Sequence, residues 1–390
     1  MPNQTLSPVE LLAAGRRVPE LDAVRGVAIL MVLVWHYVAM QLPDTPGTAV
    51  NMFRQALGMC WSGVDLFFVL SGFLIGGILI QHREAPNYFK AFYLRRACRI
   101  FPIYYAWLVL YWVLVQFGLP RLAPNTFAEG TPFWSYLLYC QNILQSRPGI
   151  EGSPFLGATW SLAVEEQFYL LFPLFVRWVS PSRLPGYLIL VALSATAIRL
   201  FFFYFMPKPG VAGYFLLPCR WDALCLGALG AWCVRVPSIV QWIRRNQWFL
   251  LGLLGICVLI IGVLRASKQS AFIYAGAHLI GFLTLAVGYL AFILLALFNE
   301  QNWVRAITSS HLLQRLGMVS YGLYLFHQPV SWLFHDLLWA QPPRITTIGT
   351  LMTTGAALVV SLALAVVSWK FFESKFVAWG RGFTYQPAPV

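Results

Sequence analysis

Charged residues are scarce in this sequence. They make up 11% of the 390 residues, whereas soluble globular proteins average about 25%. At the same time, 59% of the residues are hydrophobic and the mean hydropathy is +0.68. One soluble core cannot bury this much apolar surface, so the composition excludes an ordinary soluble globular protein and predicts that lipid is the solvent.

Recognisable metal and nucleotide motifs are also missing. No two of the seven cysteines form a C-x-x-C pair, and most lie within or beside apolar runs, at positions 60, 98, 140, 219, 225, 233 and 257. We therefore expect them to pack as small hydrophobic side chains, and we expect no metal site. The sequence contains no P-loop and no G-x-G-x-x-G, so a nucleotide would have to bind in another way.

The net charge of +13 does not predict a nucleic-acid partner, because the basic residues lie between apolar runs instead of forming one patch. The apolar runs predict an all-α polytopic membrane protein with about ten spans, each long enough to cross ~30 Å of hydrocarbon. An eleventh run, 133–146, is too short to cross and is expected to be re-entrant or interfacial. The ten predicted spans lie near 21–40, 60–80, 100–117, 160–177, 185–206, 215–234, 246–264, 272–298, 316–338 and 347–368.

The distribution of basic residues predicts the orientation. If the N-terminus is cytoplasmic and 133–146 does not cross, most of the 27 lysines and arginines fall in inner loops. We therefore expect both termini to be cytoplasmic, with a retained first span, an N-terminal tail over 1–20, one membrane domain over 21–376 and a C-terminal tail over 377–390. No internal repeat is evident, which disfavours inverted-repeat transporters.

Ionisable residues inside the predicted spans are the main functional signal, because a charge at membrane depth costs several kcal/mol. Arg25 and His36 are 11 residues apart in the first span, almost three helical turns, so they share one face. Asp65 enters from the outer end of the second span at a depth similar to that of His36. A carboxylate beside an imidazole is an arrangement for general-base chemistry, although an ion pair that locks two helices is the alternative.

Further polar residues fall at the same depth. Glu165 and Glu166 lie just inside the outer end of their span, and only one of two adjacent helix residues can face a common site. Arg220 and Asp222 begin another span and are candidate charge partners for Asp65 or a glutamate.

The segment SYGLYLFHQP places Tyr324 and His327 on one helix face. Polar contacts between helices are the alternative role for this pair. Gly72 and Gly76 form a G-x-x-x-G, which predicts close helix packing.

The inner side carries FYLRRACRIFPIYY, with Arg95, Arg96 and Arg99. A positive-inside anchor would explain most of these arginines. The alternative is phosphate binding, because a guanidinium fork matches the geometry of a phosphate.

These motifs resemble one family, the membrane-bound acyltransferase family 3, whose members include bacterial O-acetylases of envelope glycans. The resemblance rests on six segments in order: LDAVRGVAILMVLVWHYV, GVDLFFVLSGFL, YLRRACRIFPIYY, WSLAVEEQFYLLFP, RWDALCLGALGAW and SYGLYLFHQP. It covers about residues 20–376, and FFESKF matches the last family element only loosely, since relatives more often have a proline there. Some relatives carry a further hydrolase-like domain outside the membrane, and we expect none in this chain.

The resemblance implies a bacterial inner-membrane enzyme that moves an acyl group, most often acetyl, from cytoplasmic acyl-CoA to a hydroxyl of an extracytoplasmic or membrane-associated acceptor, with an envelope carbohydrate as the expected acceptor. It implies donor phosphates against Arg25, Arg95, Arg96 and Arg99, and a catalytic set of His36, Asp65 and Glu165. His36 would deprotonate the hydroxyl or carry the acyl group itself; both routes stay open. Candidates for binding the substrate or the transition state are Glu166, Arg220, Asp222, Tyr324 and His327.

A rival reading is a polytopic transporter or proton-coupled permease of envelope intermediates, because such proteins also bury Arg, Asp, Glu and His. The acceptor remains open from the sequence, and nothing in it fixes an oligomeric state. The longest predicted outer segment, 118–158, is expected to contribute to acceptor choice.

Overall fold

The computed structural model describes residues 12, 17–128, 130–205, 209–266, 280–298 and 301–387. These residues form helices and connecting turns, with no strand among them. The predicted all-α class is therefore confirmed. Most of the predicted N-terminal tail and the first part of the predicted span 272–298 lie outside the described residues.

Contacts divide the chain into two compact units. The first unit comprises residues 1–28, 64–83 and 164–318, and the second comprises 29–63, 84–163 and 319–390. Three long helices continue from one unit into the other: α2 (Pro19–Val34), α9 (Thr159–Trp178) and α18 (His311–Trp339).

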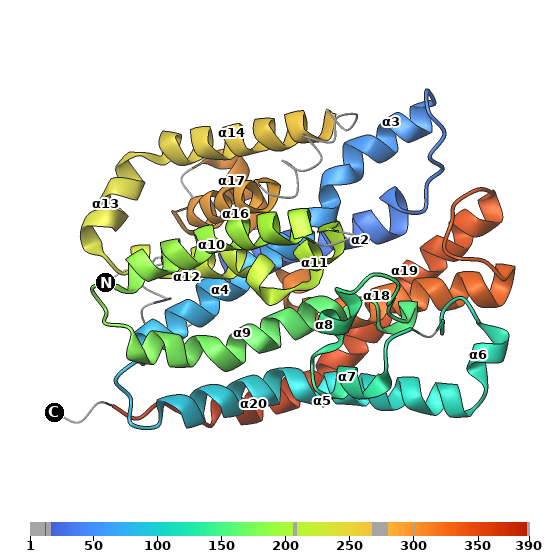
Figure 1. The fold of residues 1–390 in the computed structure, drawn as a ribbon, viewed down its shortest axis with the longest axis horizontal. Coiled ribbons are helices and arrows are strands. Elements are labelled where there is room, and N and C mark those ends of the chain that lie inside the picture. The colour runs from blue at the N-terminus through green and yellow to red at the C-terminus, as the bar shows by residue number, and fades with distance from the viewer. Residues whose placement is uncertain are drawn as a thin grey trace. The chain divides into compact units, whose positions relative to one another are not determined.

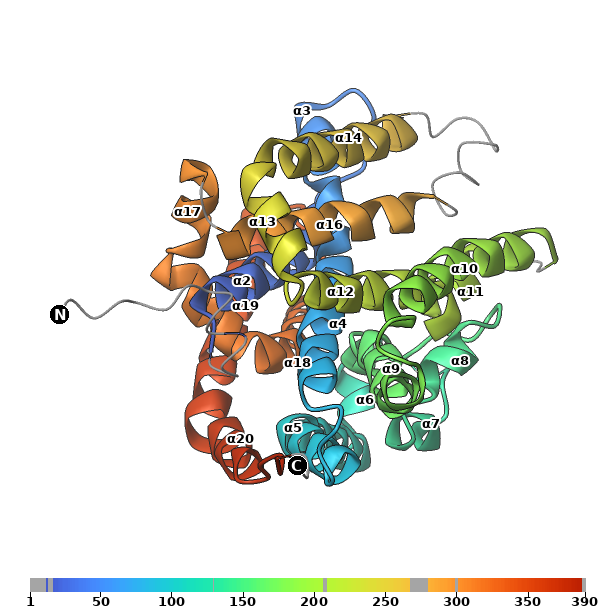
Figure 2. The same ribbon diagram turned by 90° about the vertical axis from the view of Figure 1, so that its left-hand side faces the viewer.

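The first unit is built from long apolar helices joined by short ones. Its further elements are α4 (Gly63–Gln81), α10 (Leu184–Phe205), α11 (Pro209–Phe215), η4 (Leu217–Cys219), α12 (Trp221–Cys233), α13 (Pro237–Arg245), α14 (Gln247–Ala266), α16 (Gly281–Phe298) and α17 (Asn302–Thr308). Within this unit α14 packs along α16, and α12 packs against both α10 and α16 (Figures 1 and 2).

The predicted G-x-x-x-G packs as expected in this unit. A Cβ built on Gly72 would lie 1.9 Å from the carbonyl oxygen of Leu224, and one on Gly76 would lie 2.7 Å from the Cβ of Ala228. Only glycine therefore allows α4 and α12 to approach this closely, which is how small residues hold helices together in lipid.

The second unit combines long helices with the irregular segment 118–158. Its elements are η1 (Trp35–Ala39), α3 (Ala49–Ala56), η2 (Leu57–Ser62), α5 (Tyr88–Gln116), α6 (Leu119–Leu122), α7 (Phe133–Leu137), α8 (Gln141–Gln145), η3 (Pro154–Leu156), α19 (Ile348–Ser368), η5 (Trp369–Glu373) and α20 (Ser374–Arg381). In Figure 1, α20 runs along α5, and the two helices are in contact.

Each of the ten predicted spans overlaps a helix. Among the described residues, seven helices are long and apolar enough to cross a membrane, or eight if α12 and α13, which meet at 99°, form one bent span. Those seven are Pro19–Ala39, Ala49–Gln81, Tyr88–Gln116, Leu184–Phe205, Gln247–Leu264, Gly281–Phe298 and Ile348–Arg381. The run 133–146 folds as the two short helices α7 and α8, five residues each, so it does not cross as a helix.

Candidate active site

His36 lies in a π-turn. The α-helical pattern of α2 ends at Val34, and η1 continues as a π-helix over Trp35–Ala39. Such single π-turns inside helices are often found at functional sites. The buried side chain of Gln41 stabilises this one, because its Nε2 donates to the carbonyl oxygen of His36 at 2.8 Å.

The hydrogen bonds of His36 define its tautomer. Nδ1 lies 2.9 Å from the carbonyl oxygen of Val32, one turn earlier. A carbonyl only accepts, so the hydrogen of the neutral ring is on Nδ1 and the lone pair is on Nε2. The ring is partly exposed, and no hydrogen bond to Nε2 is present among the described residues. His36 therefore offers a basic nitrogen to an incoming group.

A second imidazole lies beside His36 in the same unit. The ring centroids of His36 and His327 are 4.9 Å apart, and the ring planes make an angle of 66°. His327 is fully buried, and its Nδ1 lies 2.7 Å from the carbonyl oxygen of Tyr324. By the same reasoning the hydrogen is on Nδ1, and Nε2 has no hydrogen-bond partner among the described residues.

Neutral hydroxyl groups surround this pair. Tyr37 donates to the carbonyl oxygen of His327 at 2.7 Å, and it therefore accepts from Ser361 at 2.9 Å. Ser161 donates to the carbonyl oxygen of Ala158 at 3.1 Å. The hydroxyl of Tyr324, 2.6 Å from Ser161, is then the donor in that bond. These contacts hold the pair without any ion.

Two ion pairs are almost completely buried in the first unit. Arg220 Nη2 bonds to Asp65 Oδ1, and Arg199 Nη1 bonds to Asp222 Oδ2 at 2.8 Å. All four side chains are only 1% or 2% exposed. The guanidinium of Arg220 also lies 4.0 Å from the centroid of the Phe282 ring. The sequence predicted Asp65 as a possible partner for Arg220, and the structure confirms that pair.

The structure pairs His36 and Asp65 with different groups. The Nδ1 partner of His36 is Val32, and Asp65 belongs to the first unit, where it bonds to Arg220. The proposed orientation of His36 by Asp65 stays a prediction.

The predicted glutamates lie in the first unit. Glu165 accepts hydrogen bonds on both carboxylate oxygens, from Ser71 at 2.7 Å and from Tyr169 at 3.1 Å. Glu166 is the next residue of α9 and is partly exposed. Glu165 is thus held by hydroxyls and not by a cation in these two bonds, which leaves its catalytic role a prediction.

The arginines predicted to bind the donor differ from one another. Arg25 Nη1 is 2.8 Å from Asp22, which also accepts from Arg17 at 2.5 Å. Arg95 and Arg99, on α5, are partly exposed, and neither forms an ion pair within the described residues. Arg96, on the same helix, is also partly exposed. Arg95 and Arg99 thus have no carboxylate within ion-pair distance among the described residues, whereas Arg25 is paired with Asp22. Arg99 also interacts electrostatically with Glu373.

The segment 118–158, which the sequence predicts to be on the outer side, is folded against α18. Asp336, near the end of that helix, accepts from the side chain of Asn125 at 2.8 Å and from the backbone and hydroxyl of Thr126 at 2.8 and 3.0 Å. Burial raises the pKa of Tyr136 in this segment to about 12, so its hydroxyl remains a donor at neutral pH. Nothing in the sequence indicated the role of Asp336.

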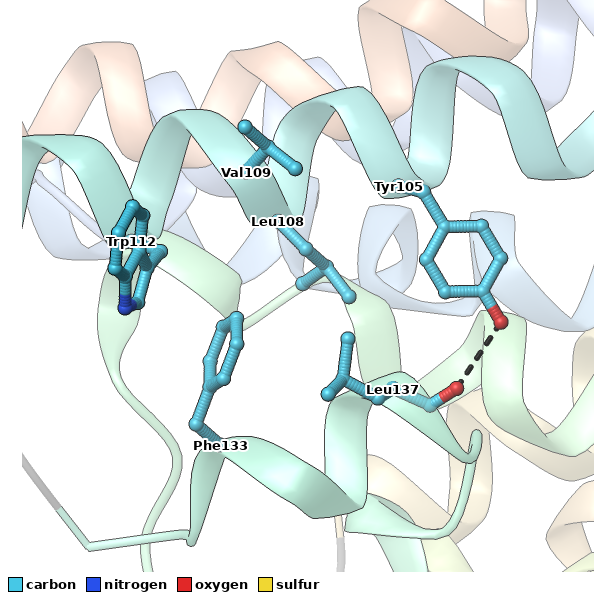
Figure 3. Close-up of a pocket in the computed structure, with 6 residues that line it drawn as sticks. All are labelled: Tyr105, Leu108, Val109, Trp112, Phe133 and Leu137. Atoms are coloured by element: carbon cyan, nitrogen blue, oxygen red, sulfur yellow. Dashed lines mark hydrogen bonds between the residues drawn. The ribbon is translucent and has the colours of Figure 1, made fainter.

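Figure 3 shows an apolar groove between α5 and α7, with a volume of about 240 Å³. The hydroxyl of Tyr105, one of its lining residues, donates to the carbonyl oxygen of Leu137 at 3.0 Å. The remaining lining residues are Leu108, Val109, Trp112 and Phe133. The one hydroxyl in its lining, that of Tyr105, is bonded to a backbone carbonyl, and the other lining side chains are apolar, so the groove is not the candidate site of chemistry.

The sequence did not predict that His327 lies beside His36. It grouped His327 with Tyr324, and the two rings are indeed close, with centroids 5.6 Å apart. The only signal was that both histidines stand in apolar spans with no charged residue next to them in the sequence.

Comparisons with known proteins give consistent results. The chain is 26% identical over 380 residues to the peptidoglycan O-acetyltransferase OatA of Listeria monocytogenes, covering 94% of this chain and 57% of that protein. It is 26% identical over 400 residues to the O-acetyltransferase OatA of Staphylococcus aureus, covering 97% of this chain and 60% of that protein. The chain thus spans little more than half the length of these relatives. No solved structure matches it. The family model of the acyltransferase domain matches residues 18–370, so the chain belongs to the membrane-bound acyltransferase family that its motifs predicted.

Proposed function

We propose that this protein is an O-acyltransferase that moves an acyl group, acetyl in the first instance, from cytoplasmic acyl-CoA to a hydroxyl of an envelope carbohydrate. The family supports acyl transfer, and the names of the relatives support O-acetylation, with peptidoglycan as the acceptor of the Listeria protein. The seven or eight apolar helices support a place in the membrane, and we propose the bacterial inner membrane with both termini inside.

One observation carries the chemistry. His36 holds its Nδ1 hydrogen on the carbonyl oxygen of Val32, and its Nε2 lone pair is not used by any described residue. A general base needs this combination of a fixed tautomer and an available nitrogen. The π-turn of η1, braced by Gln41, fixes the backbone that carries the ring.

The reaction follows from that geometry. Nε2 of His36 takes the proton of the acceptor hydroxyl, while the oxygen of that hydroxyl attacks the carbonyl carbon of the thioester. The carbon–sulfur bond then breaks, and the leaving thiolate takes the proton from His36. In the alternative route, Nε2 of His36 attacks the carbonyl carbon of the thioester, the carbon–sulfur bond breaks and CoA leaves as the thiolate. The acceptor oxygen then attacks the acyl group, the carbon–nitrogen bond to Nε2 breaks, and the hydroxyl proton ends on the thiolate.

The donor phosphates are proposed to bind at the inner part of α5. Arg95 and Arg99 are partly exposed cations that form no ion pair among the described residues, although Arg99 interacts electrostatically with Glu373, and Arg96 lies next to them. Guanidinium groups suit phosphates because they donate two hydrogen bonds from one plane. Arg25 would contribute only if the phosphate competes with Asp22.

The other predicted residues have narrower proposed roles. Tyr324 is a hydroxyl donor near the imidazoles and so is a candidate for stabilising the oxyanion. Asp65 and Glu165 remain candidate catalytic residues, and Glu166, Asp222 and Arg220 remain candidates for binding the substrate or the transition state.

A permease is the second candidate function, because Asp65, Arg199, Arg220 and Asp222 bury four charges in a membrane protein. The two candidates differ in the product, since a permease makes no new ester.

The test uses purified protein in liposomes with acetyl-CoA and peptidoglycan fragments, and it measures free CoA and the acetylated glycan by mass spectrometry. We expect His36→Ala to lower the rate by about 10²- to 10⁴-fold. His311→Ala, which removes an exposed histidine at the start of α18, is the control and should be unchanged. A wild-type rate in the His36 variant would refute the assignment. Transport of the glycan without release of CoA would favour the permease.

A further inference from the structure

His327 presents a basic nitrogen with no evident structural use. Its side chain is fully buried, its Nδ1 is held by the carbonyl oxygen of Tyr324, and its Nε2 meets no donor among the described residues. Leaving a buried acceptor without a partner costs about 1–3 kcal/mol. A purely structural residue at this place would avoid that cost, since an apolar side chain of similar size would pack there without it.

The hydrogen bonds and ring contacts of the two imidazoles within the described part of the second unit involve no ion. The ring of His327 contacts the ring of His36, which lies in η1, and the ring of Tyr324, which lies in the same helix as His327. Tyr37 bonds to the backbone carbonyl of His327 and not to its ring. Within the described part of the second unit, no carboxylate or cation bonds to either imidazole. When His36 takes a proton, the resulting positive charge therefore meets a second imidazole, whose lone pair is free.

We propose that His36 and His327 share the proton that is removed from the acceptor hydroxyl. The inference rests on the proposed function and deepens it. The proton leaves the hydroxyl for Nε2 of His36, and His327 Nε2 accepts it or a hydrogen bond from it, so that the charge is spread over two rings. The new oxygen–carbon bond forms, the carbon–sulfur bond breaks, and the thiolate takes the proton from the pair. His327 acts through His36, so it is a positioning residue.

Two substitutions separate the proton role from a packing role. In His327→Asn, the amide nitrogen stands near the place of Nδ1 and can still donate to the carbonyl oxygen of Tyr324, but no base stands at Nε2. His327→Ala removes both functions. The matched control is His335→Gln, which changes another fully buried histidine of α18, one that bonds through Nε2 to Thr354.

The kinetic test uses the same liposome assay at saturating substrates. We expect both His327→Asn and His327→Ala to lower kcat by about 10²-fold, while the KM values for acetyl-CoA and for the glycan fragments stay within about twofold of the wild type. His335→Gln should keep the wild-type kcat. A wild-type kcat in His327→Asn would overturn the proposal, because it would show that only the bond to Tyr324 matters. A change confined to either KM would also overturn it.

A second measurement does not depend on acyl transfer. With ¹⁵N-labelled histidine in the full chain in lipid, magic-angle-spinning NMR should detect a coupling between ring nitrogens of His36 and His327 when the pair takes up one proton. The coupling should be lost in His327→Asn and kept in His335→Gln. Its absence in the wild type would overturn the proposal even if His36→Ala is inactive. Its presence together with an active His36→Ala variant would refute the proposed function and, with it, the catalytic use of the pair.

Discussion

Two buried polar clusters, one in each unit of this protein, are built in different ways. In the first unit, Asp65 with Arg220 and Asp222 with Arg199 form two ion pairs that are almost completely buried. In the second unit, the buried polar groups around His36 and His327 are neutral, and they bond to backbone carbonyls and hydroxyls.

The difference between charged and neutral buried groups indicates where chemistry can occur. In a buried ion pair the two charges compensate each other. Removing one of them is costly in free energy, because the other charge is then left without a partner. A neutral imidazole has little electrostatic cost and keeps a lone pair for a proton. The first arrangement therefore holds helices in place, and the second can change protonation state during a reaction. The predictions below test this division.

The largest expected effect is on stability in the first unit. Arg220→Met leaves Asp65 as an uncompensated buried carboxylate, so we expect the free energy of unfolding to fall by about 3–5 kcal/mol. Thermal or denaturant unfolding of the purified protein measures it. The double variant Asp65→Leu with Arg220→Met should recover much of the loss, because no charge is then left unpaired.

Arg235→Met is the matched control for that experiment. Arg235 bonds only to carbonyl oxygens in the contacts seen here, those of Ala231 and Gly77 at 2.7 and 2.8 Å. Its loss strands no carboxylate, so the decrease should be smaller. If Arg220→Met and Arg235→Met destabilise equally, the ion pair is not what stabilises the first unit.

An intermediate effect on stability is expected at Asp336, a carboxylate whose hydrogen-bond donors are neutral. Asp336→Ala in the second unit removes the acceptor for Asn125 and Thr126, so we expect a loss of about 1–3 kcal/mol. The outer segment should also become more sensitive to a protease than it is in the wild type. Unchanged protease sensitivity would show that Asp336 does not hold the segment.

The smallest effect on stability is expected at Arg99, a partly exposed cation that forms no ion pair among the described residues. Arg99→Ala should change the free energy of unfolding by no more than about 0.5 kcal/mol, as for other surface substitutions. It should instead raise the KM for acetyl-CoA about tenfold, which corresponds to about 1.4 kcal/mol, with little change in kcat. Arg121→Ala, at an exposed arginine of the outer segment, is the control. A flat KM in the Arg99 variant would exclude this phosphate site.

Much of the fold followed from the sequence, because lipid imposes long apolar helices whose positions are visible in hydropathy. The same logic predicted that Gly72 and Gly76 mark a close helix contact, and that Arg220 is a partner for Asp65. In the first case a steric clash restricts the possible neighbours. In the second case the free-energy cost of an unpaired buried ion does so.

The site was less predictable, because hydropathy does not say which helices pack together. His36 and His327 are neutral, so no electrostatic cost pointed from one to the other. The π-turn that carries His36 depends on Gln41, a side chain with no recognisable motif. The pairing of Arg25 with Asp22 was also not predicted, although the two residues are three positions apart on one helix.

The anchors of the two imidazoles have one more consequence. Val32 precedes His36 by one helical turn, and Tyr324 precedes His327 by one turn, so each ring takes its anchor from its own chain segment. If the helices shift to admit a bulky glycan, each ring keeps the hydrogen bond that places its hydrogen on Nδ1. The helices can thus move between turnovers without changing the tautomer of either histidine.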